Sequence, residues 1–255
     1  MSEPGRLAGK TAVVTGSTRG IGLAIARAFI REGARVVVNS RSAADCEAVA
    51  RGLGPSALAL AADLARSDDV RRLAHEAGAA LGGAPDVLVN NAGQPRVAPS
   101  EELPEADYRD TLDLNLNGYF VLSQDVGRGM LARGSGTIIN ISSIFGLVAV
   151  PQRLAYCVSK AALNMMTKVM AIEWAARGVR VNAIAPGYVE TEFIGGLIAR
   201  GLLDPTKLAR RTPMGRLGSS DEIAEAALFL ATPGASFITG EILTVDGGWS
   251  SYGFL

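Results

Sequence analysis

Short apolar stretches alternate with longer stretches of helical periodicity over most of the chain. The apolar stretches are rich in Val, Ile and Ala, as is typical of buried strands, and they cover residues 10–15, 35–39, 57–62, 86–89, 136–141, 179–184 and 242–245. The helical stretches cover residues 23–31, 68–81, 105–133, 155–176 and 220–231. This alternation predicts an α/β fold in which about seven parallel strands form a doubly wound sheet with helices on both faces.

Residues 188–218 interrupt this regular pattern. They combine paired glycines, Gly195 and Gly196, with apolar and basic residues, and the pattern assigns no strand or helix to them. An irregular insertion at the ligand edge of a sheet is typical of a mobile cover, so we interpret this segment as a substrate lid. The chain has no internal repeat and no linker, so residues 1–255 are expected to form a single domain that carries the lid.

Three glycines, Gly16, Gly20 and Gly22, follow the first predicted strand directly. Glycine lets the backbone turn tightly and approach a phosphate, while the helix that follows presents free N–H groups to that charge. The spacing G-x-x-x-G-x-G differs from the G-x-G-x-x-G dinucleotide pattern, and a glycine-rich turn also occurs as a simple connector. The second strand, residues 35–39, has the separation that a dinucleotide-binding βαβ unit requires, which favours a nucleotide site.

The end of the second strand indicates which dinucleotide would bind. An NAD site usually places a carboxylate there for the ribose 2′-hydroxyl, but this chain has Asn39, Ser40 and Arg41. Arg41 and Arg19, which lies in the glycine turn, are both suited to bidentate phosphate binding. NADP(H) is therefore expected rather than NAD(H). The alternative is that both arginines are simply solvated.

Polar residues also follow other predicted strands. Asp63 follows the third strand, where it would touch an adenine. The stretch Asn90-Asn91-Ala92-Gly93 follows the fourth strand and either lines the ligand crevice or forms an ordinary turn. Asn115 lies in the middle of the helix predicted for residues 105–133, where asparagine is unfavourable unless its amide has another partner.

Tyr156 and Lys160 are four residues apart in the helix predicted for residues 155–176, so both project from one helix face. A tyrosine alone has a pKa near 10. An ammonium about 4 Å away, at an effective dielectric near 20, favours the phenolate by roughly 4 kcal/mol, or about three pKa units. The pair is a candidate acid–base site, although the same spacing is common on amphipathic helices with a surface lysine.

The charge balance bears on the class of partner. Lys plus Arg and Asp plus Glu number 25 each, so no excess positive charge is available for nucleic acid or an anionic membrane. The first residues lack the apolar run of a signal peptide, and no stretch is apolar for long enough to span a membrane. We therefore expect a cytoplasmic protein with a small-molecule partner. Cys46, Cys157 and His75 form no cluster, so neither a disulfide nor a metal site is indicated.

Several motifs occur together in a fixed order. They are Thr15-Gly16-x-x-x-Gly20-Ile21-Gly22, Asn90-Asn91-Ala92-Gly93, Asn115, Ser143, Tyr156-x-x-x-Lys160 and Pro186-Gly187. Between about Leu7 and Trp249 the chain thereby resembles the short-chain dehydrogenase/reductase family. The resemblance implies a Rossmann-like, dinucleotide-binding catalytic domain. Within the family, the pattern is most similar to the 3-oxoacyl-carrier-protein reductases and related ketone reductases.

The resemblance also implies roles for these residues. Tyr156 would be the acid–base group in hydride transfer, and Ser143, rather than Ser142, would bind the substrate carbonyl oxygen. Lys160 would hold the nicotinamide ribose and lower the pKa of Tyr156, while Asn115 would seat a water linked to Lys160. The residues expected to contact the cofactor are Gly16, Ser17, Arg19, Gly20, Ile21, Gly22, Ser40, Arg41, Asp63, Asn91, Gly93, Tyr156, Lys160, Pro186, Val189 and Thr191. No metal is required.

The residues expected to contact substrate are Ser143, Arg153, Tyr188 and Phe193. Many acyl-carrier-protein reductases of the family have glutamine three residues before the tyrosine, whereas this chain has Arg153 there. An arginine at this position either binds a substrate carboxylate or points to solvent. A carrier-bound substrate remains open, and the resemblance implies a homotetramer.

These observations favour an NADPH-dependent carbonyl reductase that transfers hydride to a ketone or 3-oxoacyl substrate and oxidises the alcohol in reverse. The alternative is an NADP-linked polyol or sugar-acid dehydrogenase, because the same residues would catalyse alcohol oxidation equally well. A non-enzymatic alternative is an NADP-sensing binding protein. The intact set of Asn115, Ser143, Tyr156 and Lys160 argues against a sensor, because a sensor needs no acid.

Overall fold

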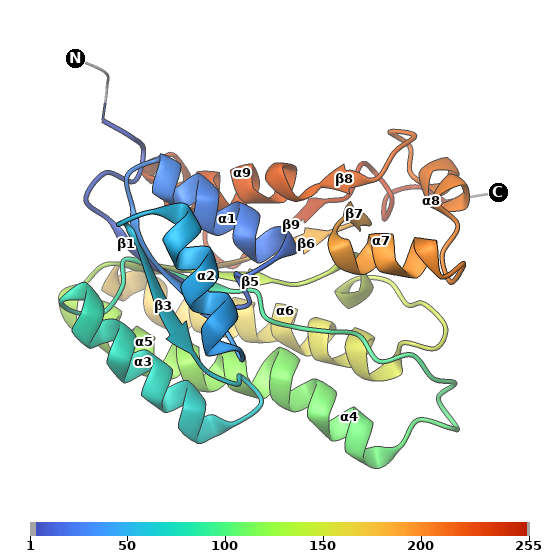
Figure 1. Cartoon of the computed structure of the whole chain (residues 1–255), viewed down its shortest axis with the longest axis horizontal. Coiled ribbons are helices and arrows are strands. Elements are labelled where there is room, and N and C mark those ends of the chain that lie inside the picture. Colours follow the sequence, from blue (N-terminus) through green and yellow to red (C-terminus); the bar gives the residue numbers. More distant parts are fainter. Residues whose placement is uncertain (1–3, 254–255) are drawn as a thin grey trace.

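The computed structural model describes residues 4–253, apart from the side chain of Phe193. Its centre is a seven-stranded sheet in the order β3-β2-β1-β4-β5-β6-β9, in which all neighbouring strands are parallel (Figure 1). The strands are β1 (Thr11–Val14), β2 (Arg35–Ser40), β3 (Ala57–Ala61), β4 (Val87–Asn90), β5 (Gly136–Ile141), β6 (Val179–Pro186) and β9 (Ile242–Val245). The α/β sheet expected from the sequence pattern is confirmed.

Helices cover both faces of this sheet. They are α1 (Gly20–Arg31), α2 (Ala43–Leu53), α3 (Ser67–Leu81), α4 (Glu105–Leu112), α5 (Gly118–Arg133), α6 (Leu154–Trp174), α7 (Glu192–Ala199), α8 (Pro205–Arg211) and α9 (Ser220–Ala231). Helices α1 and α9 pack on one face, and α3, α5 and α6 pack on the other (Figure 1). Such a doubly covered sheet explains why its strands are continuously apolar.

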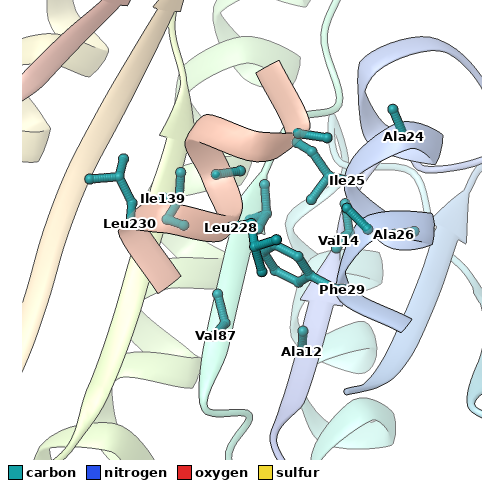
Figure 2. Close-up of a cluster of buried hydrophobic side chains, with 14 of the residues drawn as sticks. Ala12, Val14, Ala24, Ile25, Ala26, Phe29, Val87, Ile139, Leu228 and Leu230 are labelled. Atoms are coloured by element: carbon teal, nitrogen blue, oxygen red, sulfur yellow. The ribbon is translucent and has the colours of Figure 1, made fainter. Parts of the chain in front are cut away.

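Neighbouring strand residues serve opposite faces. On one face, Val14 of β1 packs with Ile25 and Phe29 of α1 and Leu228 of α9 (Figure 2). The adjacent Val13 belongs to the cluster on the other face, which contains apolar side chains from α3, α5 and α6. Each large side chain that is fully buried in this way contributes about 1.5–3 kcal/mol. The two clusters hold the strand ends rigidly in register.

The helix expected at residues 105–133 is continuous but not uniform. Between α4 and α5, Asp113–Asn117 form a π-helical turn, with Asn115 fully buried at its centre. A π-turn inside an α-helix is rare and frequent at functional sites. Helix α3 begins at Ser67, one residue before the stretch predicted from the sequence. Arg66 holds the cap position without a side-chain hydrogen bond.

The lid segment (residues 188–218) is more regular than the sequence pattern indicated. It contains α7 and α8, and its two ends are joined by a small parallel sheet of β7 (Val189–Glu190) and β8 (Gly218–Ser219). Local caps explain both helices: the Thr191 hydroxyl accepts from Ile194 N at 3.3 Å, and Asp204 accepts from the first turn of α8. The expectation of irregular structure was therefore wrong. No helix among residues 4–253 is both long and apolar enough to span a membrane.

Candidate active site

A cleft of about 860 Å³ lies at the carboxyl ends of the central strands. Because parallel strands end at the same edge, segments far apart in sequence meet there. The cleft brings together most of the residues that the sequence singled out. They are Gly16, Arg19, Gly20, Ile21, Gly22, Ser40, Arg41, Asn91, Gly93, Ser143, Arg153, Tyr156, Lys160, Pro186, Tyr188, Val189 and Thr191.

Three expected site residues, Ser17, Asp63 and Asn115, do not line the cleft. Ser17 is fully buried, and its hydroxyl donates to Val14 O at 2.7 Å and accepts from Asn39 N at 3.0 Å, so it joins two strands instead. The Asp63 carboxylate accepts from Ala65 N at 3.0 Å in its own turn. Asn115 lies behind the cleft wall. The side chain of Phe193 is outside the described part of the structure.

The glycine turn forms a surface on which side chains would collide. A Cβ added at Gly22 would lie 2.4 Å from both Asn91 Nδ2 and Gly16 O. The Asn91 amide donates to Thr15 O at 2.8 Å and to Gly16 O at 3.0 Å, which fixes the turn. The N-terminus of α1 has no side-chain cap. This bare helix end therefore suits a phosphate group.

The end of β2 lies beside the glycine turn and contributes the next part of the cleft. Arg19 and Arg41 are exposed, and neither guanidinium has a hydrogen-bond or ion-pair partner among the described residues. Asn39 is fully buried and donates to Leu60 O at 3.0 Å, so its amide is occupied. Sequence reasoning did not place Ser42 or Asp45 in the cleft. The start of α2 brings both residues there.

Ser143 and Tyr156 meet across the cleft wall. Ser143 lies two residues after the end of β5, accepts a hydrogen bond from Phe145 N at 3.1 Å, and lines the same cleft as Tyr156 of α6. Ser142 is directed elsewhere, since its hydroxyl donates to Asn164 Oδ1 at 2.5 Å. Ser143 is therefore the serine beside the tyrosine, as the sequence suggested. Burial raises the pKa of Tyr156, and the nearby hydroxyl of Ser143 opposes this rise.

Lys160 lies one helical turn beyond Tyr156 and is only 3% exposed. Its Nζ donates to Ile141 O at 2.8 Å and lies 5.7 Å from the centroid of the Tyr156 ring. Burial lowers the pKa of Lys160 to about 7. The expected lowering of the tyrosine pKa by Lys160 is not seen, because burial of Tyr156 dominates.

Asn115 supports the loop that follows β4. Its Oδ1 accepts from Gln94 N and its Nδ2 donates to Gln94 O, both at 3.2 Å. The same Nδ2 lies 3.4 Å from Ser159 Oγ on α6. A Cβ added at Gly93 would lie 2.9 Å from Asn115 Oδ1 and 3.7 Å from Lys160 Nζ. The amide thus has the alternative partners that an asparagine inside a helix needs.

Phe145 and Tyr188 line the cleft that holds Tyr156, and both pack against Trp249, which does not line it. The Phe145 ring meets Tyr188 at 6.0 Å and Trp249 at 5.8 Å between centroids, both nearly perpendicular. Leu197 and Leu203 of the lid segment line the same cleft. Sequence reasoning missed Phe145 and Trp249, because single aromatic residues in separate segments share no local pattern.

Comparison with known proteins agrees with this geometry. Residues 16–250 match the family described as Enoyl-(Acyl carrier protein) reductase. A galactitol 2-dehydrogenase (L-tagatose-forming) of Cereibacter sphaeroides is 45% identical over 249 residues, 96% of each chain. A gluconate 5-dehydrogenase of Gluconobacter oxydans (strain 621H) is 39% identical over 254 residues, 97% of this chain and 98% of the relative.

A solved structure shares the whole fold. The gluconate 5-dehydrogenase from Burkholderia cenocepacia J2315, in complex with NADP and tartrate, superposes with a TM-score of 0.91, 41% identity and 97% coverage of each chain. Sequence and structure agree over nearly the full length, and the glycine turn, Ser143, Tyr156 and Lys160 share one cleft. The chain belongs to the short-chain dehydrogenase/reductase family.

Proposed function

We propose that this protein is an NADP(H)-dependent dehydrogenase that oxidises a secondary alcohol of a polyol or sugar acid and catalyses the reverse reduction. The observation that carries the proposal is the placement of Ser143, Tyr156 and Lys160 together in the same cleft as the glycine turn. The galactitol and gluconate dehydrogenases described above favour this alternative over the reduction of a 3-oxoacyl or carrier-bound substrate.

The cleft fits a dinucleotide along its length. The bare N-terminus of α1 would hold the pyrophosphate, and Arg19 and Arg41 would hold the 2′-phosphate that distinguishes NADP from NAD. Pro186, Val189 and Thr191 would flank the nicotinamide end. When bound, the nicotinamide supplies the hydride acceptor or donor. The NADP complex of the Burkholderia cenocepacia relative supports this choice of cofactor.

The chain's own residues handle the proton. In the oxidising direction, the phenolate form of Tyr156 would accept the proton of the substrate hydroxyl while Ser143 donates a hydrogen bond to the same oxygen, and in reduction the hydroxyl form would return that proton. Lys160, with a pKa of about 7, can carry a proton near neutrality and would hold the ribose beside Tyr156. Asn115 anchors the loop at Gln94 and keeps Gly93 close to Lys160, so it would position a water there.

The lid segment would close over bound substrate. Its ends are fixed by the pairs Val189–Gly218 and Glu190–Ser219, so the helices between them can move while the base stays in place. Ile194, Leu197 and Leu203 already face the cleft. Closure would exclude water from the reacting carbon.

We also propose that the protein assembles as a homo-oligomer. Helices α5 and α6 leave an apolar surface of Phe120, Met165, Val169 and Ile172 exposed, and Ile172 is 79% exposed. A contiguous exposed apolar surface of this kind marks an interaction site. A second copy of the same chain would cover it symmetrically, which is consistent with the tetramer implied by the family.

A substrate panel tests the proposed activity. Galactitol, D-threitol and gluconate would each be mixed with enzyme and NADP⁺, and a ketone ester and a 3-oxoacyl thioester with enzyme and NADPH. Absorbance of NADPH reports turnover. We expect kcat/KM for at least one polyhydroxy compound to exceed that for both carbonyl substrates. A higher value for the 3-oxoacyl thioester would overturn the assignment.

A further inference from the structure

Arg153 occupies the substrate end of the cleft. It directly precedes α6, lies three residues before Tyr156, and lines the same cleft as Ser143 and Tyr188. The side chain is half-buried. Its position is therefore on the wall where a substrate would lie with its reacting carbon at Tyr156.

The guanidinium of Arg153 has no charged partner among residues 4–253. Its one side-chain hydrogen bond, from Nη1 to the carbonyl oxygen of Gln152, is long at 3.3 Å, and no carboxylate of the described residues forms an ion pair with it. The positive charge of Arg153 acts on its neighbour Tyr188 in the cleft. Burial raises the pKa of Tyr188, and the charge of Arg153 opposes that rise. A half-buried cation without a counter-charge is costly unless an anion joins it.

The backbone at this point is strained. Gln152 has φ of 62°, the only positive value at a non-glycine residue between residues 4 and 253. Its carbonyl oxygen accepts from Arg153 Nη1 and from Ala98 N at 3.2 Å, which joins the start of α6 to the loop after β4. Glutamine in this conformation costs roughly 1–2 kcal/mol, and such strain is typically retained at functional sites.

We infer that Arg153 binds the carboxylate of the substrate, so the natural substrate is a polyhydroxy acid and not a neutral polyol. This inference rests on the proposed function and selects between its two substrate classes. An arginine fork matches a carboxylate through two parallel N–H···O bonds, which a hydroxyl cannot use in the same way. The acid at this end of the cleft, Glu192, is exposed in the first turn of α7 and makes no ion pair with Arg153.

The decisive comparison uses gluconate and galactitol, which share a hydroxylated chain and differ in charge. Wild-type enzyme, Arg153→Gln and Arg153→Lys would be assayed with each compound and NADP⁺. For Arg153→Gln we expect kcat/KM for gluconate to fall roughly ten- to a hundredfold, mainly through KM, with less than a threefold change for galactitol. Arg153→Lys should recover part of the loss, because it keeps the charge without the fork.

Arg177→Gln provides the matched control, because Arg177 is an exposed arginine outside the cleft and should leave both substrates unaffected. Equal losses with gluconate and galactitol in Arg153→Gln, or a wild-type preference for galactitol, would overturn the inference. Calorimetric titration of gluconate into the enzyme–NADP⁺ mixture distinguishes failure of the carboxylate site from failure of the proposed activity. Binding that requires Arg153 without any turnover would leave the carboxylate site standing and refute the proposed activity. Binding that is the same in Arg153→Gln would refute the site alone.

Discussion

The ammonium nitrogen of Lys160 lies 5.7 Å from the centroid of the Tyr156 ring. At this separation both groups share one buried environment, which disfavours the charged form of each. The pKa of Lys160 falls to about 7 and that of Tyr156 rises. Near neutrality the pair is therefore neutral or carries only the charge of Lys160, and ionising Tyr156 beside a protonated Lys160 places two opposite charges in the same buried environment.

The first prediction concerns the proton-transfer group. Tyr156→Phe keeps the ring and removes only the hydroxyl, in the cleft that Ser143 also lines. We expect turnover to fall roughly a hundred- to ten-thousandfold, with NADPH affinity nearly unchanged. Steady-state kinetics and NADPH fluorescence titration measure the two effects. Turnover within a few fold of wild type would remove Tyr156 from the reaction.

The second prediction is a pH dependence of stability. Lys160 has a pKa of about 7 in the folded protein and an ordinary value of 10.5 when unfolded. Between these values the unfolded chain binds more protons, so the free energy of unfolding rises with pH. Below about pH 7 Lys160 is protonated in both states, and the full free-energy cost of burying its charge then lowers the stability of the folded protein. In Lys160→Met, which does not titrate, this contribution disappears.

Urea denaturation of wild type and Lys160→Met across pH 7 to pH 10.5 checks this sign. We expect the stability of wild type relative to the variant to increase by about 1 kcal/mol per pH unit in that window. A constant difference between the two proteins would show that Lys160 has an ordinary pKa. The variant should also lose turnover, since Lys160 is proposed to hold the ribose.

The third prediction is the choice of cofactor. Each contact between an arginine and the 2′-phosphate is worth about 1.5–3 kcal/mol, and exposure and salt reduce this, so an NADPH preference of about a hundredfold is expected. Replacing Ser40 by Asp and Arg41 by Ala should reverse it, because a carboxylate accepts from ribose hydroxyls and repels phosphate. Arg51→Ala, an exposed change on α2 outside the cleft, should have no effect. The measurement is kcat/KM with each cofactor at fixed ionic strength. A wild-type preference for NADH would mean that neither Arg19 nor Arg41 reaches the ribose.

The fourth prediction tests the glycine turn. In Gly22→Ala the new Cβ would lie 2.4 Å from Asn91 Nδ2 and Gly16 O, so the turn must shift. We expect a loss of about 1–3 kcal/mol in stability and at least tenfold weaker NADPH binding. Gly52→Ala, in α2 with nothing within 4 Å of its Cβ, should instead stabilise by roughly 0.5–1 kcal/mol. Thermal denaturation and NADPH titration compare the two. Equal behaviour of the pair would show that the turn tolerates a side chain.

The fifth prediction concerns assembly. Ile172→Asp places a charge on the exposed apolar surface of α5 and α6, where Met165 and Val169 are also exposed. We expect the variant to have a lower molar mass in solution than wild type, because burying an unpaired carboxylate is costly. Val97→Asp, at an exposed apolar residue in the loop after β4, is the control. Light scattering after gel filtration measures both masses. A wild-type monomer, or an unchanged mass in Ile172→Asp, would exclude this surface as the interface.

The sequence by itself determined the features that depend on neighbours along the chain. Strand alternation, the glycine turn and the four-residue spacing of Tyr156 and Lys160 are local patterns, so their structural outcome was predictable. The unfavourable position of Asn115 within a helix was also a readable signal, and the structure gives its amide partners in Gln94 and Ser159. The order of the motifs then sufficed to indicate the family.

Only the tertiary structure decided which side chains face the cleft and what their surroundings do to them. Ser17 lies next to Gly16 in sequence but points into the sheet, because its hydroxyl forms hydrogen bonds with both β1 and β2. The aromatic cluster of Phe145, Tyr188 and Trp249 comes from three separate segments. The pKa of Tyr156 depends on burial, and burial is set by contacts between distant parts of the chain, which spacing along the sequence cannot express.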